Sequence, residues 1–370
     1  MQPDESLADI ANRLNISIAE LSYLNGLSPT EPLVSGQAIL IPHLRRVIVS
    51  LGYFQLRNLE DLGRTLTEID SLITYGALFQ LPVSVDGVFI IPKDTAIERY
   101  VSLLKSHHIL PLLVITNLGP EGFDPDLARA IIGNPTVKNQ TIINLIQVLA
   151  HFGFAGVNLD FENIKREDRQ LYSKFVRDIK RILGADGYLV TLTVPPKNSD
   201  SPEDAFDYQT LGQWADLIFI MTYDWGYMTG PPMAVAPNNE VRKVLSYAVS
   251  TIPRAKIIQG IPLYGYDWQL PFTPGSSAKA VNLVDVYDVA RRFGATIDYD
   301  PVAESPNFHY TYETGNEHVV WFEDSRSVRA KYAGARNFGL GGVGFWSGLN
   351  SPYGFHQNWV IFNEMFLALK

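Results

Sequence analysis

The stretch 154–163, FAGVNLDFEN, ends an otherwise apolar run in two carboxylates, Asp160 and Glu162. In a strand, alternate side chains share a face, so both carboxylates would lie on one face together with Asn158. An unpaired carboxylate is costly to bury, so this face predicts a chemical site. Two carboxyls this close shift each other's titration, so that one holds a proton while the other is ionised. Glu162, at the end of the run, is the better placed to reach a substrate.

Eight apolar, β-branched runs along the chain predict the strands that position these acids. They cover residues 46–53, 72–79, 110–118, 155–163, 187–195, 215–224, 256–266 and 341–348. Amphipathic segments such as 141–153 and 170–184 lie between most of them. Apolar strands that alternate with helices indicate a parallel sheet buried on both faces. Eight such units predict an α/β fold, a (β/α)8 (TIM) barrel, with its active site at the C-terminal ends of the strands.

Residues 269–322 interrupt this alternation between the seventh and eighth runs. Their second half alternates in polarity and is rich in Tyr, Thr and Val, which is typical of antiparallel strands. We predict a small α+β insertion between strands seven and eight that forms one wall of a cleft. The last helix of the barrel is predicted at residues 356–369.

The composition excludes several classes of function. The chain has 370 residues, 46% hydrophobic and 19% charged, as in a folded globular protein. The net charge is −9, and no cluster of Lys and Arg is long enough to track the phosphates of a nucleic acid. Nucleic acid is therefore not an expected partner. The absence of cysteine excludes disulfides and thiolate chemistry, and the seven His show no metal-ligand spacing. We expect no metal and no cofactor.

No run in the sequence approaches the roughly 18 apolar residues of a membrane span. The first residues, MQPDESLADI, are acidic and do not resemble a signal peptide. We expect no membrane-spanning segment and a monomeric protein.

Four motifs in order resemble glycoside hydrolase family 18 over roughly residues 46–369. AGVNLDFE at 155–162 is similar to the family's strand-four signature, and MTYD at 221–224 to its strand-six motif. GIPLYGYDW at 260–268 is similar to the strand-seven motif, and Trp346 in GFWS to the strand-eight Trp that floors the sugar site. The resemblance implies a family 18-like barrel at residues 46–370.

The resemblance also implies a retaining, substrate-assisted mechanism with three catalytic residues. Glu162 is the expected general acid, and Asp160 and Tyr223 orient the reacting acetamido group. The sugar that contributes the anomeric carbon is then expected to be N-acetylated. The expected substrate-binding residues, at or near the ends of strands, are Asn158, Asp224, Trp346, Tyr264, Asn117 and Tyr53.

Each of these residues also has a simpler interpretation. Asp160 and Glu162 could form an internal ion-paired network, and Tyr223 and Trp346 could be core aromatics. Asp224 could either orient the strand end of Tyr223 or bond sugar hydroxyls.

Departures from the chitinase pattern favour one branch of the family. Ala155 and Asn158 stand where chitinases usually have Asp, and strand three ends VITNL instead of Ser-x-Gly-Gly. With VWFEDSRSV at 320–328, these features resemble the spore-associated branch, N-acetylglucosaminidases of cortex peptidoglycan. This resemblance implies a spore or cell-wall location and a peptidoglycan or chitin-like glycan as partner. The alternatives are a chitinase or chito-oligosaccharide hydrolase, and a catalytically silent glycan-binding protein.

Residues 1–43 predict a separate small module. SLADIANRLN and SIAELSYLNGL have helical spacing, with Ser17 as an N-cap, and QAILIP at 37–42 predicts a strand. The module resembles a LysM domain, which binds N-acetylglucosamine polymers. The usual first strand of a LysM domain would precede Gln2, but only Met1 does so in this sequence. The module is therefore expected to be truncated. The alternative is a helical cap without a ligand. The matching positions are Ser6-Leu7, Ile10-Ala11, Leu21, Leu24-Asn25, Leu33, Gly36-Gln37 and Leu40-Ile41-Pro42.

Overall fold

The computed structural model divides the chain into an N-terminal unit, residues 1–47, and a large unit, residues 48–369. The described residues are 5–14, 17–25, 27–30, 32–33, 48–56, 59–69, 72–91, 96–201, 204–312, 315–346 and 356–367.

The N-terminal unit contains the two predicted helices, α1 (Leu7–Leu14) and α2 (Ile18–Asn25). They share a small apolar cluster made of Leu7, Ile10, Ala11 and Leu21. Before α1, the Ser6 backbone N–H donates to Asp9 Oδ2 at 3.0 Å and the Asp9 N–H to Ser6 Oγ at 3.2 Å. This reciprocal capping box explains where the helix begins. The predicted strand at 37–42 and the truncated start of the module lie outside the described residues.

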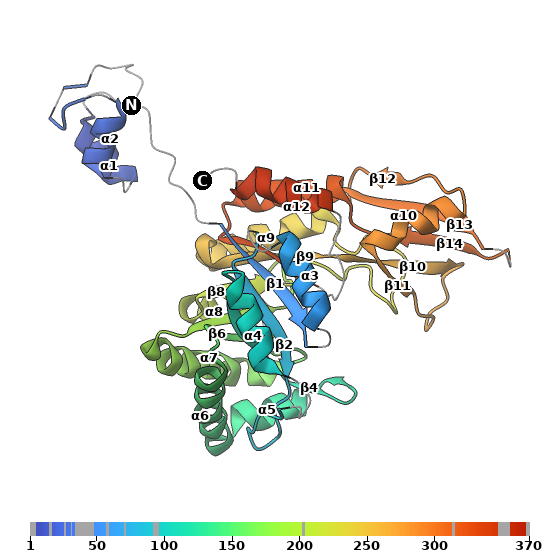
Figure 1. The fold of residues 1–370 in the computed structure, drawn as a ribbon, viewed down its shortest axis with the longest axis horizontal. Coiled ribbons are helices and arrows are strands. Elements are labelled where there is room, and N and C mark those ends of the chain that lie inside the picture. The colour runs from blue at the N-terminus through green and yellow to red at the C-terminus, as the bar shows by residue number, and fades with distance from the viewer. Residues whose placement is uncertain are drawn as a thin grey trace. The chain divides into compact units, whose positions relative to one another are not determined.

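The large unit is built on a closed parallel barrel of eight strands, which confirms the predicted fold (Figure 1). Around the barrel the order is β1, β2, β3, β6, β7, β8, β9 and β15, so strands adjacent in the barrel follow one another along the chain. Their bounds are β1 Val49–Gln55, β2 Tyr75–Leu81, β3 Leu110–Thr116, β6 Gly156–Asp160, β7 Leu189–Val194, β8 Leu217–Ile220, β9 Ile257–Pro262 and β15 Gly342–Trp346.

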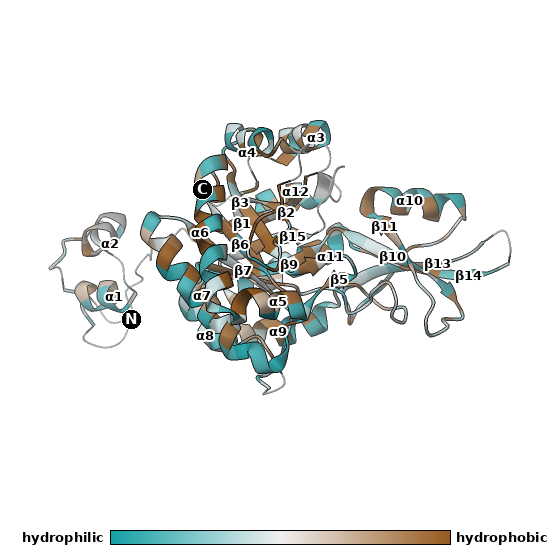
Figure 2. Ribbon diagram, turned by 90° about the horizontal axis from the view of Figure 1, so that it is seen from below, coloured by the Kyte–Doolittle hydropathy of each residue, from teal (hydrophilic) through white to brown (hydrophobic). Residues whose placement is uncertain are grey.

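Helices surround this barrel and turn their apolar sides toward it (Figure 2). Phe161, on the apolar side of the acid-bearing segment, packs on Tyr172 and Phe175 of α7 with ring centroids 6.1 and 5.7 Å away. The helices are α3 Leu59–Ile69, α4 Ile97–Ser106, α5 Pro125–Gly133, α6 Pro135–Phe152, α7 Arg169–Leu183, α8 Tyr208–Trp214, α9 Asn238–Thr251, α11 Ser325–Phe338 and α12 His356–Phe362. Three 3-10 turns, Arg166–Asp168, Gly184–Asp186 and Arg254–Lys256, complete this layer, and a π-helical turn, Asn363–Leu367, follows α12.

Local sequence fixes the ends of several helices. Asn134 caps α6 through bonds from the backbone of Thr136 and Val137, and Pro135 occupies its first turn. Gly153 ends α6 with φ of +75°, a conformation that favours glycine. The connection from α6 into β6 is therefore short and well defined.

The insertion between the last two barrel strands is a five-stranded antiparallel sheet with one helix. The sheet order is β11-β10-β14-β13-β12. Figures 1 and 2 show it extending to one side of the barrel together with α10. Its elements are β10 Tyr264–Leu270, β11 Lys279–Asn282, α10 Leu283–Arg292, β12 Asp298–Asp300, β13 Ser305–Thr311 and β14 Glu317–Trp321.

The predicted strand 256–266 is in fact two strands of two different sheets. β9 ends at Pro262, whose backbone has no N–H to continue the barrel ladder, and β10 begins at Tyr264. The Leu263 N–H between them donates to the Trp346 carbonyl at 2.7 Å. The insertion sheet thus starts upstream of residue 269.

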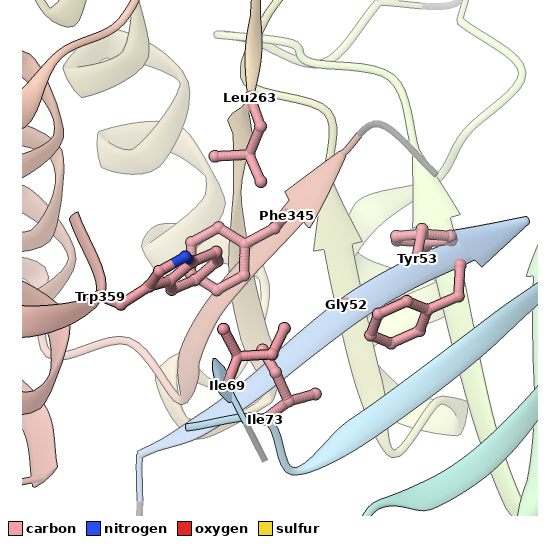
Figure 3. A pocket seen from close by; sticks show the side chains of 8 residues that line it. Gly52, Tyr53, Ile69, Ile73, Leu263, Phe345 and Trp359 are labelled. Carbon is pink, nitrogen blue, oxygen red and sulfur yellow. The ribbon is translucent and has the colours of Figure 1, made fainter. Parts of the chain in front are cut away.

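A small apolar gap of about 10 Å³ lies between β1, β15 and α12 (Figure 3). Ile69, Ile73 and Trp359 are among its lining residues, and it is too small to hold a sugar. Among the helices of the described residues, none combines the length and apolarity needed to cross a bilayer.

Candidate active site

A cleft of about 270 Å³ opens at the C-terminal ends of the barrel strands. It brings together the predicted acids, Asp160 and Glu162, with four other predicted residues, Tyr53, Tyr223, Asp224 and Trp346. The lining is completed by Phe79, Phe123, Thr193 and Met221.

The two acids lie in the cleft without a cation, Asp160 buried and Glu162 partly buried. Asp160 is buried, and its Oδ1 has no hydrogen-bond partner among the described residues. Burial raises the pKa of Asp160 well above its usual range, and the Glu162 charge adds to this. Burial, and then the charge of Asp224, raises the pKa of Glu162 to about 7. The pair therefore retains a proton near neutral pH, as a general acid requires.

Asn158 lies beneath the cleft and not on its surface, which corrects the prediction that it contacts substrate. It is fully buried, and its Nδ2 donates to Thr191 Oγ1 at 3.0 Å. Its Oδ1 accepts from Thr193 Oγ1 at 3.0 Å, and the Tyr53 hydroxyl lies 2.6 Å from the same Thr193 oxygen. These bonds hold Tyr53 in place next to Asp160. Burial and the charge of Asp160 raise the pKa of Tyr53 well above its usual range, so its phenol stays neutral.

Tyr264 also supports the cleft from behind. It is buried, and its hydroxyl donates to Asp224 Oδ1 at 2.6 Å. Asp224 has a φ of +61°, a left-handed conformation that is uncommon for a residue with a side chain. Burial raises the pKa of Asp224, and the bond from Tyr264 opposes that rise. Asp224 therefore lines the cleft, while Tyr264 fixes its orientation.

Two glycines make room for the aromatic side of the cleft. A Cβ on Gly260 would lie 2.8 Å from the Phe219 ring and 2.9 Å from the Tyr223 ring. A Cβ on Gly344 would lie 2.6 Å from the Phe219 ring. Because such contacts are closer than carbon atoms tolerate, Gly260 leaves room for the Tyr223 ring, and both glycines leave room for Phe219.

Asn117 is fully buried and does not line the cleft, contrary to the prediction. Its Oδ1 accepts from the Glu162 backbone N–H at 2.9 Å, and its Nδ2 donates to the Glu162 carbonyl at 2.8 Å. The same Nδ2 donates to the Asp124 carbonyl at 2.9 Å. Asn117 thus connects the backbone of the acid to the segment that follows the hairpin of β4 (Leu118–Gly119) and β5 (Gly122–Phe123).

Sequence reasoning missed Phe79, Phe123, Met221 and Thr193. Phe79 and Tyr53 both contact the Trp346 ring, with centroids 5.1 and 5.4 Å away. Phe79 could have been found, because it ends a predicted strand as Tyr53 does. Phe123 could not, because only the β4–β5 hairpin brings it to the cleft.

Within the described residues, no group of three or more His, Asp or Glu is arranged to hold a metal ion. The chemistry that the cleft offers is proton transfer by carboxyl groups beside an aromatic floor.

Comparisons with known proteins agree with this site. The family model for glycosyl hydrolases family 18 matches residues 116–348, and the LysM domain model matches residues 2–42. The cortical fragment-lytic enzyme of Bacillus anthracis is 38% identical over 335 residues, which cover 88% of this chain and 76% of the relative.

Solved structures give the same result. The Bacillus cereus spore cortex-lytic enzyme SleL is 36% identical, with a TM-score of 0.81. The match covers 99% of this chain and 86% of the SleL chain. A chitinase from Chromobacterium violaceum ATCC 12472 is 28% identical with a TM-score of 0.78. The match covers 86% of this chain and 98% of the chitinase chain. These similarities confirm the predicted resemblance to the spore-associated branch. The chain therefore belongs to glycoside hydrolase family 18, and is a glycoside hydrolase with a LysM domain before its barrel.

Proposed function

We propose that this enzyme is a retaining, substrate-assisted hydrolase of N-acetylglucosaminyl bonds in bacterial peptidoglycan, with spore cortex as its substrate. The observation that carries the proposal is the Glu162 carboxyl, raised in pKa and placed in one cleft with Asp160 and Tyr223. The relatives named for cortical fragments and spore cortex support the choice of glycan.

In the proposed first step, protonated Glu162 gives its proton to the glycosidic oxygen as the bond from that oxygen to the anomeric carbon breaks. The substrate's own 2-acetamido oxygen forms the new bond to the anomeric carbon, which gives an oxazolinium ion. Asp160 and Tyr223 orient the acetamido group, and the unpartnered Asp160 Oδ1 is available to accept its N–H. Ionised Asp160 offsets the positive charge.

In the second step Glu162, now ionised, removes a proton from a water molecule. The water oxygen bonds to the anomeric carbon on the face that the leaving group occupied, and the oxazolinium ring opens. The configuration is retained because the anomeric carbon is inverted twice. Trp346, with Phe79 and Tyr53 against it, provides the floor on which the sugar ring lies.

The test is mass spectrometry of soluble fragments released from purified spore cortex, vegetative peptidoglycan and chitin oligomers. Cortex fragments that end in reducing N-acetylglucosamine, absent with Glu162→Gln, support the proposal. Release from chitin oligomers alone supports the second candidate, a chitinase, which the similarity to the Chromobacterium enzyme favours. Binding to all three without release would leave a glycan-binding role.

We also propose that the protein acts at the spore or cell wall as a monomer. One chain supplies every residue that lines the cleft, so the site needs no second copy. The LysM domain suits a protein retained on wall glycan. Light scattering after size-exclusion chromatography tests the monomer, and fractionation of spores with an antibody tests the location.

A further inference from the structure

A second groove, of about 660 Å³, is lined in part by the same β4–β5 hairpin that brings Phe123 to the catalytic cleft. One wall is the segment 82–90, which follows β2, and the other is the hairpin with the start of α5. Figure 1 shows the β4 hairpin extending from the barrel next to α5. The groove shares no lining residue with the cleft.

The groove and the cleft are adjacent along two separate stretches of chain. Phe79 lines the cleft and the next residue, Gln80, lines the groove. Phe123 lines the cleft and the next residue, Asp124, lines the groove. The two depressions are therefore neighbours at two places along the chain.

The segment 82–90 presents apolar side chains on a fixed backbone. Val85 is 58% exposed and Ile90 is 54% exposed. The Ile90 N–H donates to the Pro82 carbonyl at 2.8 Å, and Asn144 Nδ2 of α6 donates to the Gly87 carbonyl at 2.8 Å. Apolar side chains held rigidly in water next to a groove are typical of a binding surface.

The start of α5 adds two carboxylates to the groove lining. Asp124 caps α5, accepting from the backbone N–H groups of Asp126 and Leu127, and Asp126 is exposed and pairs with Lys165. The groove is therefore lined by apolar side chains from the segment 82–90 and by carboxylates from the start of α5.

We propose that this groove binds the peptide stem of peptidoglycan, an inference that rests on the proposed function. Peptidoglycan carries a short peptide on alternate sugars, with small apolar side chains and a diamino acid, whereas chitin carries none. Val85 and Ile90 would contact the methyl groups of alanine residues, and the carboxylates would face the free amino group. A stem on a sugar next to the cleft would need only to pass the hairpin to reach them.

The experiment compares kcat/KM on soluble peptidoglycan fragments with their stems and on the same fragments after an amidase has removed the stems. In the variant V85S/I90S we expect the wild-type preference for stem-bearing fragments, about tenfold, to fall to about twofold or less, because apolar contacts of this size are worth 10-fold or more. Hydrolysis of the stripped fragments should stay within about twofold of the wild type.

The matched control is V302S/I182S, which changes the same two residue types at exposed positions, 65% and 42% exposed, that do not line the groove. It should keep the full preference. Equal kcat/KM on both substrates with the wild type would overturn the stem site and leave the hydrolase standing. A preference that survives in V85S/I90S would overturn it too. Hydrolysis of neither substrate would refute the proposed function, and the stem site with it.

Discussion

Two of the places where the chain buries carboxylates differ in whether a cation accompanies them. In the cleft, Asp160 and Glu162 lie beside each other, and no ion pair joins either to a cation within the described residues. Just after β14, Glu323 is fully buried, but Lys331 of α11 donates to its Oε2 at 2.8 Å, and both side chains have 0% exposure. Burial raises the pKa of Glu323 while Lys331 opposes that rise.

The difference separates a site suited to proton transfer from a site that stabilises the fold. A buried ion pair cancels its own charge and fixes two elements, here the last insertion strand and a barrel helix. A carboxylate pair without a cation has no such compensation and stays partly protonated, which is costly for stability but suits proton transfer. We expect substitutions at the two places to have opposite effects on activity and on stability.

The largest expected effect is that of Glu162→Gln on catalysis. The amide keeps the shape of the acid but cannot give a proton, so kcat/KM should fall by about 10²–10⁴-fold or more. Stability should be retained. Fragment release followed by chromatography measures the rate, and calorimetric binding of a glycan fragment checks that the cleft is intact. Near-normal turnover would show that Glu162 belongs with the structural carboxylates.

Lys331→Met should instead lower stability and leave activity nearly unchanged. It leaves Glu323 buried without its cation, which costs about 3–5 kcal/mol of unfolding free energy. The activity per folded molecule should change little. Urea unfolding measures the loss, and the double variant K331M/E323L should recover most of it because two apolar side chains then replace the pair. If the double variant is no more stable than the single one, the pair does not act as a unit.

The raised pKa of Glu162 predicts how the unfolding free energy depends on pH. The folded state holds this proton up to about pH 7, whereas the ordinary pKa is 4.5, so the folded state binds more protons between these values. The contribution of Glu162 to the unfolding free energy should therefore be lost as pH rises from about 4.5 to 7, by on the order of 3 kcal/mol.

Glu162→Gln lacks that proton and should show a correspondingly smaller decline in urea unfolding over the same pH range. The wild-type rate should also fall as pH rises above about 7. Parallel stability curves for the two proteins would contradict the raised pKa.

Asn117→Ala should have an intermediate effect, because it removes three bonds that position the backbone around Glu162 and Asp124. We expect kcat to fall about 10-fold with little change in KM, and about 1–3 kcal/mol of stability to be lost. Asn144→Ala, which removes a comparable bond to the Gly87 carbonyl away from the cleft, is the control and should keep kcat on stripped fragments. A rise in KM alone would mean that Asn117 acts on substrate binding.

The smallest effect is expected from Tyr264→Phe. Without the bond to Asp224, the pKa of Asp224 should rise, and its negative charge beside Glu162 should diminish. Since that charge helps to raise the pKa of Glu162, the alkaline limb of the rate profile should move to lower pH. The rate at its optimum should change by only a few fold. An unmoved limb would indicate that Asp224 does not tune Glu162.

The sequence was sufficient for features that follow from local pattern. The alternation around Asp160 and Glu162 predicted their common face, and eight apolar runs predicted the barrel. It failed where a role depends on contacts made after folding. Asn117 ends a strand as Tyr53 does, yet it bonds the backbone of Glu162, 45 positions away. Phe123 and the second groove depend on how a hairpin packs, which no periodicity records.

The junction between the barrel and the insertion also limits how residues behind the cleft can move. Only Leu263 separates the last barrel position of β9 from the first residue of β10, and its N–H is bonded to the carbonyl of Trp346. There is no hinge of free length at this joint, so Tyr264, whose hydroxyl bonds Asp224, is held close to the floor that holds Trp346. The Asp224 carboxyl is therefore held in place in the cleft through the same joint that connects the barrel to the insertion sheet.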